Sequence, residues 1–204
     1  MSKSTKYQIS SNKNDKLRTT NFFYMTRFKQ FVIFSLSTLL FVSAVGILGT
    51  KLSKTYSNAD RNFQVSYPSN WKVDENYSPD LICINGPVID TLTKQTDGAI
   101  TINTRINSKV ITTTENYKAK IAYYQANCTQ FKIIEEGELV LGEVKSKYVI
   151  HKSKVDSAFL TTVQFYFSNG KTSFILGGSV PGETLGKYKT LYFDIAKSIK
   201  FTKK

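Results

Sequence analysis

The chain has 204 residues and a mass of 23.1 kDa, which suits one ordinary domain with additional segments but not two full-sized domains. Hydrophobic residues make up 41% of it and charged residues 21%, so a disordered or collagen-like chain is excluded. One His and two Cys exclude zinc fingers, disulfide-dense scaffolds and His-rich metal sites. We therefore expect no metal and no other cofactor.

The basic character of the chain is concentrated at its start. Residues 1–54 hold nine Lys and Arg against a single acid, so they carry most of the net charge of +13. Residues 1–30 are rich in Ser, Thr, Asn and Lys and lack apolar periodicity, which predicts a disordered basic tail. Such a tail is attracted to anionic lipid headgroups. Because most of the excess charge lies outside the folded part, we expect no nucleic-acid partner.

An apolar segment follows at residues 31–48. Its 18 residues contain no charge, and as a helix they would span roughly 27 Å, close to the thickness of a bilayer's hydrocarbon core. Lys and Arg are more frequent before this segment than after it, which favours a cytoplasmic N-terminus. We therefore predict a single-pass membrane anchor with a cytoplasmic tail and an extracytoplasmic C-terminal domain.

Retention of this anchor depends on whether a signal peptidase cleaves after it. The best match to a cleavage site, Ser57-Asn58-Ala59, lies about ten residues beyond Leu48, which is farther than usual. We therefore prefer an uncleaved anchor to a signal that is removed after export. The composition of the tail also fits an organelle transit peptide.

Residues 49–59 are predicted to be a linker and residues 60–204 the folded domain. Apolar side chains alternate from Phe63 to Tyr67, and Pro68 then begins a turn before Trp71 and Val73. This pattern predicts a short opening hairpin or arch. Further strands are expected at residues 81–84 and 99–106.

A helix is predicted in the middle of the domain. Thr112 and Glu115 have the spacing of a capping box, which begins a helix over residues 113–126. Its apolar face comprises Tyr117, Ile121 and Tyr124. Three strands are then expected at residues 131–141, 143–152 and 157–167.

The dipeptide Asn169-Gly170 between two apolar runs predicts a two-residue hairpin turn. With this turn, Phe165 would face Phe174 and Val163 would face Leu176. A closing amphipathic helix is indicated by apolar residues at helical spacing from Leu185 to Ile199. The order of elements predicts an α+β fold in which helices flank an antiparallel β-sheet.

Candidate nucleophiles are few. Ser179 lies between a predicted strand and a predicted helix, as in a nucleophile elbow, but Pro181 stands where that motif requires Gly. No acid near His151 in the sequence would orient its ring. We therefore predict no catalytic residue and no enzyme. The alternative is an envelope hydrolase that uses Cys128 or Ser179 with His151.

The two cysteines leave two interpretations open. A disulfide between Cys83 and Cys128 would close a loop of about 45 residues and stabilise an exported domain by about 3 to 4 kcal/mol. Both cysteines also fall on apolar faces, where free thiols are often simply buried.

A run of acids occurs at Glu135, Glu136 and Glu138. Neighbouring side chains of a strand point to opposite faces, so Glu136 and Glu138 share a side that Glu135 does not. A hard cation needs six or more oxygen ligands. We therefore interpret the run as a solvated sheet edge, or as a bulge at Gly137, rather than as a metal site.

The opening segment carries a resemblance to a known family. Phe63, Tyr67, Pro68 and Trp71 form a pattern, F-x-V-x-Y-P-x-x-W, that resembles the opening of PsbP-like domains, a group that includes bacterial PsbP-related proteins and DcrB-like proteins. The resemblance covers residues 60–202 and implies an α-β-α sandwich on the exported side of a membrane. It implies structural roles for these four residues, a non-catalytic function and no catalytic residues.

These observations predict a membrane-anchored PsbP-like domain that binds a protein or assists assembly of a membrane complex. The alternatives are a photosystem II-associated extrinsic-type protein in the thylakoid lumen, a small-ligand carrier with a pocket between sheet and helix, and the envelope hydrolase described above.

Overall fold

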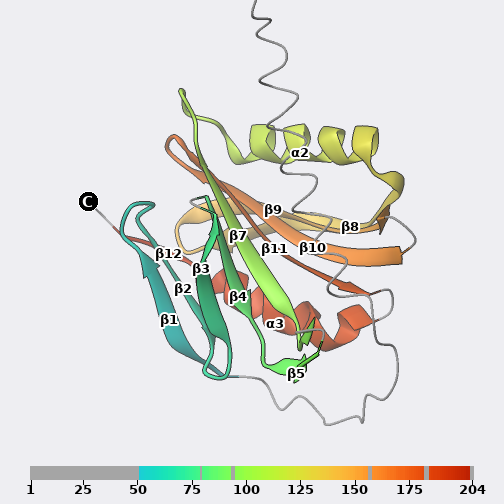
Figure 1. Cartoon of the computed structure of the whole chain (residues 1–204). Coiled ribbons are helices and arrows are strands. Elements are labelled where there is room, and N and C mark those ends of the chain that lie inside the picture. Colours follow the sequence, from blue (N-terminus) through green and yellow to red (C-terminus); the bar gives the residue numbers. More distant parts are fainter. Residues whose placement is uncertain (1–50, 79, 93–94, 156–157, 182–183, 203–204) are drawn as a thin grey trace, which may run out of the picture.

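The computed structural model describes residues 51–78, 80–92, 95–155, 158–181 and 184–202 (Figure 1). Most of the strands in these residues form one seven-stranded antiparallel sheet with the order β3-β4-β7-β11-β10-β9-β8. The predicted tail at 1–30 and the predicted anchor at 31–48 lie outside the described residues. The strands of the large sheet are β3 (Lys72–Ser78), β4 (Leu81–Asn85), β7 (Ala99–Ile106), β8 (Thr129–Leu141), β9 (Val144–Val155), β10 (Ala158–Asn169) and β11 (Thr172–Pro181).

A smaller sheet contains β1 (Leu52–Asn58), β2 (Phe63–Pro68) and β12 (Lys200–Phe201), with β2 in the centre. The prediction of a linker at residues 49–59 is therefore wrong for most of that range. The strand β1 was not predicted because its sequence is largely polar, and only Leu52 and Tyr56 pack against the core. Backbone pairing with β2, rather than side-chain burial, holds most of β1 in place.

The opening segment forms an arch. β2 belongs to the small sheet and β3 to the large one, so the chain crosses from one sheet to the other between Pro68 and Lys72. The backbone N–H of Trp71 donates to the carbonyl of Pro68 at 3.0 Å and closes the turn. Of the two predicted geometries, hairpin and arch, the structure has the second.

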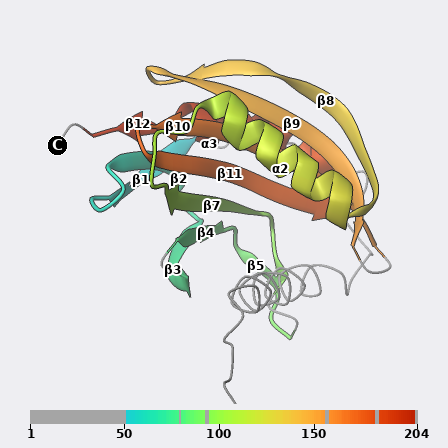
Figure 2. The same ribbon diagram turned by 90° about the horizontal axis from the view of Figure 1, so that it is seen from above.

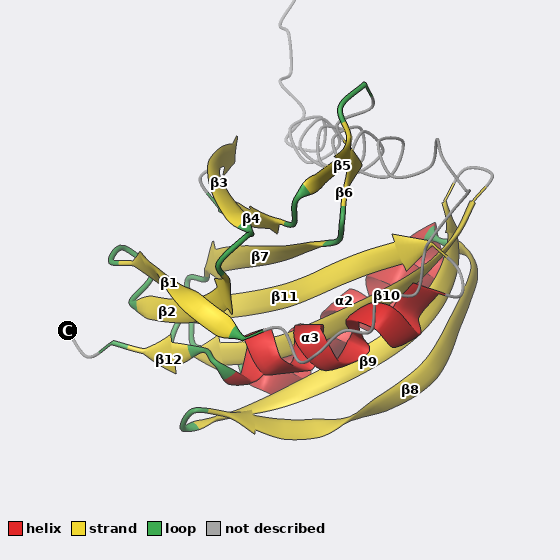
Figure 3. Cartoon of the chain, turned by 90° about the horizontal axis from the view of Figure 1, so that it is seen from below, coloured by secondary structure: helices red, strands yellow, loops and turns green. Residues whose placement is uncertain are grey.

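The two described helices lie on opposite faces of the large sheet. α2 (Thr113–Asn127) packs on β9 and β10, as the view from above shows (Figure 2). α3 (Leu185–Lys197) packs on β10 and β11 and is seen in front of the sheet from below (Figure 3). The predicted α+β arrangement of an antiparallel sheet flanked by helices is confirmed. In the described part of the chain, neither helix has the length and apolar character of a membrane span.

The α3 face of the sheet carries the main core. Phe63 of the small sheet meets Phe174 of β11 edge to face at a centroid distance of 5.6 Å. Phe167 stacks on Phe174 at 4.9 Å. From α3, Tyr192 and Ile195 are fully buried against these strands. This continuous aromatic core joins both sheets to the closing helix.

The α2 face has a smaller and more polar core. Thr112 and Glu115 form the predicted capping box, with each side chain bonded to the other residue's backbone N–H. Ile121 and Tyr124 are buried as predicted, and Tyr117 packs edge to face on Tyr166 at 5.4 Å.

The register of the β10–β11 hairpin differs from the prediction by two residues. Asn169 pairs with Thr172, so the two turn residues are Gly170 and Lys171 rather than Asn169 and Gly170. Gly170 has a φ of 60°, as the first central residue of a type II′ turn requires. Phe174 consequently faces Phe167. A shift of two residues keeps every side chain on its predicted face of the sheet.

The strands define two ends of the domain, which Figure 1 shows at the bottom and the top. The lower end is the one at which β1 begins, where Leu52 pairs with Pro68. The same end holds the pair Lys72 and Asn85, and the hairpin of β5 (Val88–Asp90) and β6 (Gln95–Thr96) that follows it. The upper end is the one at which β7 ends, where Ile106 lies beside the β10–β11 turn.

Candidate functional site

The structure does not arrange Ser179 as a nucleophile. β11 continues to Pro181, so Ser179 lies within a strand rather than at a turn between strand and helix. Its hydroxyl is 2.9 Å from the hydroxyl of Thr162 on the neighbouring strand. The predicted position between strand and helix is therefore wrong.

His151 is a buried residue of the α2 face. Its ring is 2% exposed and lies 5.1 Å from the ring of Tyr124 and 4.9 Å from that of Phe131. Among the described residues neither ring nitrogen has a hydrogen-bond partner. Hydrogen-bonded activation of Cys128 or Ser179 by this histidine is therefore absent from this geometry.

Gln164 lies close to the His151 ring. Its amide nitrogen donates to the hydroxyl of Tyr124 at 2.8 Å, and its oxygen accepts from the hydroxyl of Tyr166 at 2.5 Å. Burial lowers the pKa of His151 to about 4, so the ring is neutral near pH 7.

Cys83 and Cys128 are both free, so the disulfide left open above is not formed. Cys83 lies in β4, whereas Cys128 immediately precedes β8 at the far edge of the sheet. Five strand spacings separate β4 from β8, which amounts to about 24 Å along the sheet. A disulfide requires Cα atoms closer than about 7 Å. Burial raises the pKa of the Cys83 thiol to about 12, which makes it a poor nucleophile.

Each glutamate of the acidic run on β8 is bonded to another side chain of the protein. Glu135 accepts from Lys189 of α3 at 2.6 Å and from Tyr148 at 3.1 Å. On the opposite side, Glu136 accepts from the Tyr117 hydroxyl and Glu138 pairs with Lys147 at 2.6 Å. Within the described residues no three His, Cys, Asp or Glu side chains are grouped as metal ligands.

The two register irregularities in β8 fall between Thr129 and Lys132 and between Ile133 and Glu135, and not at the predicted Gly137. Gly137 is required for another reason. A Cβ atom there would stand 2.7 Å from the ring of Tyr148.

An open depression of about 440 Å³ lies at the C-terminal end of α2. Its lining comprises Gln125, Cys128, Gln130, Phe131 and Ile133. A single aromatic side chain in an open, largely polar hollow offers little to hold an apolar ligand.

The residues of the opening pattern are structural. Phe63, Tyr67 and Trp71 are buried in the main core, and Pro68 ends β2. None of the three aromatic rings is presented to a partner on the surface.

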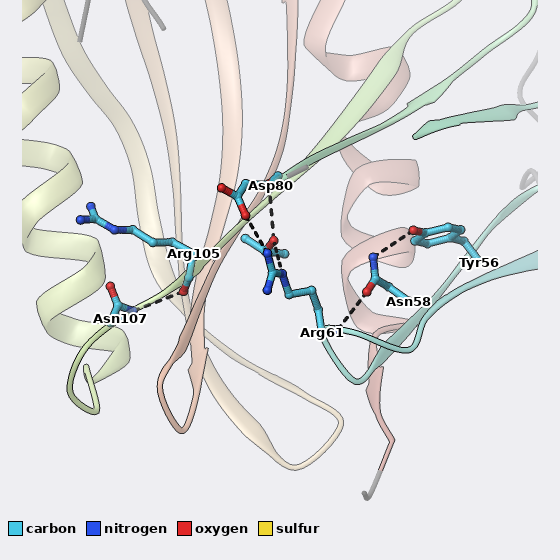
Figure 4. Close-up of polar contacts among 7 residues, drawn as sticks. Tyr56, Asn58, Arg61, Asp80, Arg105 and Asn107 are labelled. Carbon is cyan, nitrogen blue, oxygen red and sulfur yellow. Dashed lines mark hydrogen bonds and ion pairs between the residues drawn. The ribbon is translucent and has the colours of Figure 1, made fainter. Parts of the chain in front are cut away.

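A polar network at the upper end ties three segments together (Figure 4). The Arg61 guanidinium, from the β1–β2 turn, forms an ion pair with Asp80 at 2.7 Å and donates to the Thr104 hydroxyl of β7 at 3.3 Å. The backbone N–H of Arg61 donates to Asn58 at 2.9 Å, and the Asn58 amide donates to Tyr56 at 3.1 Å. The small sheet is thereby fixed to the large one at this end.

Asn107 fixes the segment that follows β7. Its backbone N–H donates to the carbonyl of Lys171 at 2.8 Å, and its side-chain amide donates to the Ser173 hydroxyl at 2.8 Å. The end of β7 is thus held to the β10–β11 turn by main-chain and side-chain bonds.

Two aliphatic side chains project from this fixed segment. Ile106 is 59% exposed and Val110 is 63% exposed. Lys109 is exposed between them in the chain. Arg105 is exposed as well, but as the strand neighbour of Ile106 it stands on the opposite face of β7, and its guanidinium points away from the network in Figure 4. We call these four residues, Arg105, Ile106, Lys109 and Val110, the upper patch. Exposed aliphatic side chains close to cations are found on surfaces that bind other proteins.

Sequence reasoning missed the upper patch. The pairs Arg105-Ile106 and Lys109-Val110 were the available signal. The first pair ends a predicted strand and the second lies in the loop before a predicted helix, and neither was assigned to an exposed surface.

The lower end has a network of its own. Asp97, which precedes β7, pairs with Lys187 of α3 at 2.5 Å and accepts a hydrogen bond from the Tyr188 hydroxyl. Partial burial of Asp97 opposes ionisation, but Lys187 and Tyr188 together lower the pKa of its carboxyl group below the ordinary value.

Solved structures with this arrangement of elements exist. The chain superposes on cyanobacterial PsbP from Synechocystis with a TM-score of 0.54 and 15% identity, over 80% of this chain and 98% of the other. The chain has the PsbP-like fold. LpqN of Mycobacterium tuberculosis matches with a TM-score of 0.50 and 12% identity, over 74% of this chain and 90% of the other.

A protein from Bacteroides thetaiotaomicron also matches, with a TM-score of 0.54 and 13% identity over 76% of this chain. This chain spans only 50% of that protein's length. Compared as a sequence, the chain matches no protein family and no curated protein. At such low identities the comparisons establish the PsbP-like fold, which the F-x-V-x-Y-P-x-x-W pattern had predicted, and not a function.

Proposed function

We propose that the chain is a single-pass membrane protein whose PsbP-like domain binds another protein, or assists assembly of a membrane complex, without performing catalysis. The uncharged segment 31–48 supports the membrane anchor, and the excess of bases before it supports an extracytoplasmic domain. A non-catalytic role is supported by the bond of the Ser179 hydroxyl to Thr162 and by the burial of His151 without a hydrogen bond to a nucleophile among the described residues.

The observation that carries the proposal is the upper patch. Ile106 is exposed although the end of β7 that carries it is held to the β10–β11 turn by Asn107, and Val110 is exposed between Asn107 and the helix cap at Thr112. A strand end that is already ordered loses little conformational entropy when a partner binds it. The cations of the patch favour a partner that carries carboxylates near an apolar surface.

One structural neighbour is compatible with this role. LpqN is described as involved in cell envelope biogenesis. The role proposed for this chain is also one at a membrane, and the argument for it rests on the anchor and the upper patch.

Affinity capture with matched variants tests the proposal. The full chain is captured from gently solubilised membranes of its source cells as wild type and as the double variant Ile106→Asp/Val110→Asp. The control is Ile134→Asp/Val140→Asp, which changes the same residue types at exposed positions of β8 that are 49% and 62% exposed. We expect at least one protein whose recovery falls with the first variant and stays at the wild-type level with the second.

Two outcomes would contradict the proposal. Equal recovery of every protein by both variants would exclude the upper patch as a docking surface. Release of the wild-type chain from membranes by alkaline extraction, or protection of the domain from protease added outside intact cells, would exclude the anchored and exported arrangement.

A further inference from the structure

The β5–β6 hairpin exposes a cluster of aliphatic side chains at the lower end. Val88 is 54% exposed, Ile89 is 62% exposed and Leu92 is 93% exposed. Solitary apolar residues are common on protein surfaces, but three strongly exposed aliphatic residues within one short hairpin are unusual and indicate a partner.

The base of the hairpin is held in place. Gly86 N–H donates to the carbonyl of Gly98 at 2.9 Å, and Asp97 N–H donates to the carbonyl of Pro87 at 2.8 Å. The Asp97 carboxylate in turn binds Lys187 of α3. At the tip, the Asp90 carboxylate accepts from Leu92 N–H at 2.9 Å, so this acid is engaged within the turn. The aliphatic side chains are thus presented in a defined position.

The chain reaches the lower end directly from the apolar segment. Leu48 ends that segment, Leu52 begins β1, and only Gly49, Thr50 and Lys51 lie between them. Fully extended, such a connection spans at most about 14 Å. The headgroup layer on each side of a bilayer is itself about 5 to 8 Å thick. A membrane-spanning segment 31–48 would therefore hold Leu52 at the level of the headgroups or immediately above them.

The hairpin lies at the same level of the domain as Leu52. Leu52 pairs with Pro68 at the end of β2. The chain then turns into β3, whose first residue, Lys72, pairs with Asn85, and Val88 follows Asn85 within a few residues. Figure 1 shows the start of β1 and the β5–β6 hairpin both at the bottom of the domain. Lys51, Lys54 and Lys72 are exposed at this end and would lie near lipid phosphates.

We propose that the β5–β6 hairpin places the exposed side chains Val88, Ile89 and Leu92 in the headgroup and acyl boundary of the bilayer that holds the anchor. This inference rests on the membrane anchor of the proposed function. Contact at the hairpin and at Leu52 gives the domain two points of attachment, which fix its orientation and turn the upper patch away from the membrane.

Tryptophan scanning in brominated lipid tests the inference. The full chain is reconstituted into phosphatidylcholine and phosphatidylglycerol vesicles, with or without bromine on the acyl chains, as Ile89→Trp and as Ile106→Trp. The two isoleucines are matched, since they are 62% and 59% exposed at opposite ends of the domain. Trp71, which is 3% exposed in the core, supplies the same background in both variants.

We expect bromine to quench the added emission of Ile89→Trp, together with a shift of that emission to shorter wavelength, and to leave Ile106→Trp unchanged. Leu92→Trp should behave like Ile89→Trp. Unquenched emission from Ile89→Trp in chain that floats with the vesicles would overturn the inference alone. A blue shift without quenching would show that protein covers the hairpin and would also overturn it. Failure of the wild-type chain to float would overturn the proposed anchor and this inference with it.

Discussion

The two ends of the domain resemble one another but differ in their distance along the chain from the apolar segment 31–48. Each presents an exposed Val and Ile, Val88 with Ile89 at the lower end and Val110 with Ile106 at the upper end. Behind each pair stands an ion pair that joins distant segments, between Asp97 and Lys187 below and between Arg61 and Asp80 above.

The difference between the ends lies in where the chain enters the domain. The lower end follows residues 31–48 after three residues, whereas the upper end is separated from that segment by the length of the strands. Under the proposed anchoring, similar apolar pairs would bind different partners, a bilayer at the lower end and a protein at the upper end. Surface composition alone would not distinguish the two ends, because the proposed anchor would decide which pair can reach the membrane.

The largest expected effect loosens the packing of the lower end. A Cβ atom at Gly178 would stand 2.6 Å from the ring of Tyr192 and 2.6 Å from the carbonyl oxygen of Ala99. We expect Gly178→Ala to lower the free energy of unfolding by about 3 kcal/mol, because the backbone and α3 must move apart. Urea unfolding of the full chain in detergent, followed by Trp71 fluorescence, measures this change.

Gly186→Ala is the control for this substitution. Gly186 lies in α3, and a Cβ atom there would meet nothing within 4 Å. We expect this change to leave stability unchanged or to raise it by up to about 1 kcal/mol, because Ala favours helix. Equal destabilisation by both substitutions would contradict the close packing of Gly178.

The next effect concerns the middle of the sheet, which connects the two ends. Burial lowers the pKa of His151 to about 4 from 6.5, so the unfolded chain binds a proton that the folded chain does not. The contribution of neutral His151 to the free energy of unfolding is therefore complete above pH 6.5 and is lost as the pH falls toward 4. Between pH 7 and pH 4 we expect this residue to lower the free energy of unfolding of the wild type by about 2 to 3 kcal/mol, and we expect His151→Leu not to show this decrease.

Urea unfolding at several pH values measures this contribution as the difference between wild type and His151→Leu. At pH 7 the two should be close, because the neutral ring has no hydrogen-bond partner among the described residues. A difference that does not change with pH would contradict a buried, neutral His151.

A smaller effect compares the two ion pairs. Asp97→Asn removes the partner of Lys187, and we expect it to cost about 1 kcal/mol, since the carboxylate is partly exposed and screened by water. Asp80→Asn should cost somewhat less, because the Asp80 side chain is 46% exposed and Arg61 keeps its bond to Thr104. Chemical unfolding at pH 7 measures both changes.

The lowered pKa of Asp97 makes its contribution dependent on pH. Because the pKa is lowered in the fold, this contribution is present above pH 3.8 and is lost as the pH falls below that value. An Asp97→Asn variant as stable as wild type at pH 7 would contradict a stabilising role for the contacts of Asp97 with Lys187 and Tyr188.

The smallest expected effect on stability comes from the exposed pairs themselves. Ile106→Asp/Val110→Asp at the upper end and Val88→Asp/Ile89→Asp at the lower end should each change the free energy of unfolding by no more than about 0.5 kcal/mol per substitution. A larger loss from either variant, measured by the same urea unfolding, would show that the pair belongs to the core rather than to a binding surface.

The sequence predicted those elements that have a strong local pattern. The helix after Thr112 was found through its capping box, and the strands β8 to β10 through their alternation. β1 was missed because its polar sequence, LSKTYSN, is held by backbone pairing. The position of the β10–β11 turn was missed because Asn169-Gly170 and Gly170-Lys171 satisfy the same glycine requirement, and the stacking of Phe167 on Phe174 accompanies the second.

Both exposed patches required the three-dimensional structure. Neither Ile106 nor Ile89 differs in its local sequence from an isoleucine that would be buried in a strand. Their exposure results from the end of β7 and from the projection of the β5–β6 hairpin beyond the large sheet, which are tertiary features. The ion pairs likewise join residues that are 19 and 90 positions apart.

Photocrosslinking at both ends in intact cells tests the central claim most directly. A photoreactive amino acid is placed at position 89 in one chain and at position 106 in another, and the adducts are identified after irradiation. The account predicts a lipid adduct from the position of Ile89 and a protein adduct from the position of Ile106. A protein adduct from the first position, or a lipid adduct from the second, would contradict it.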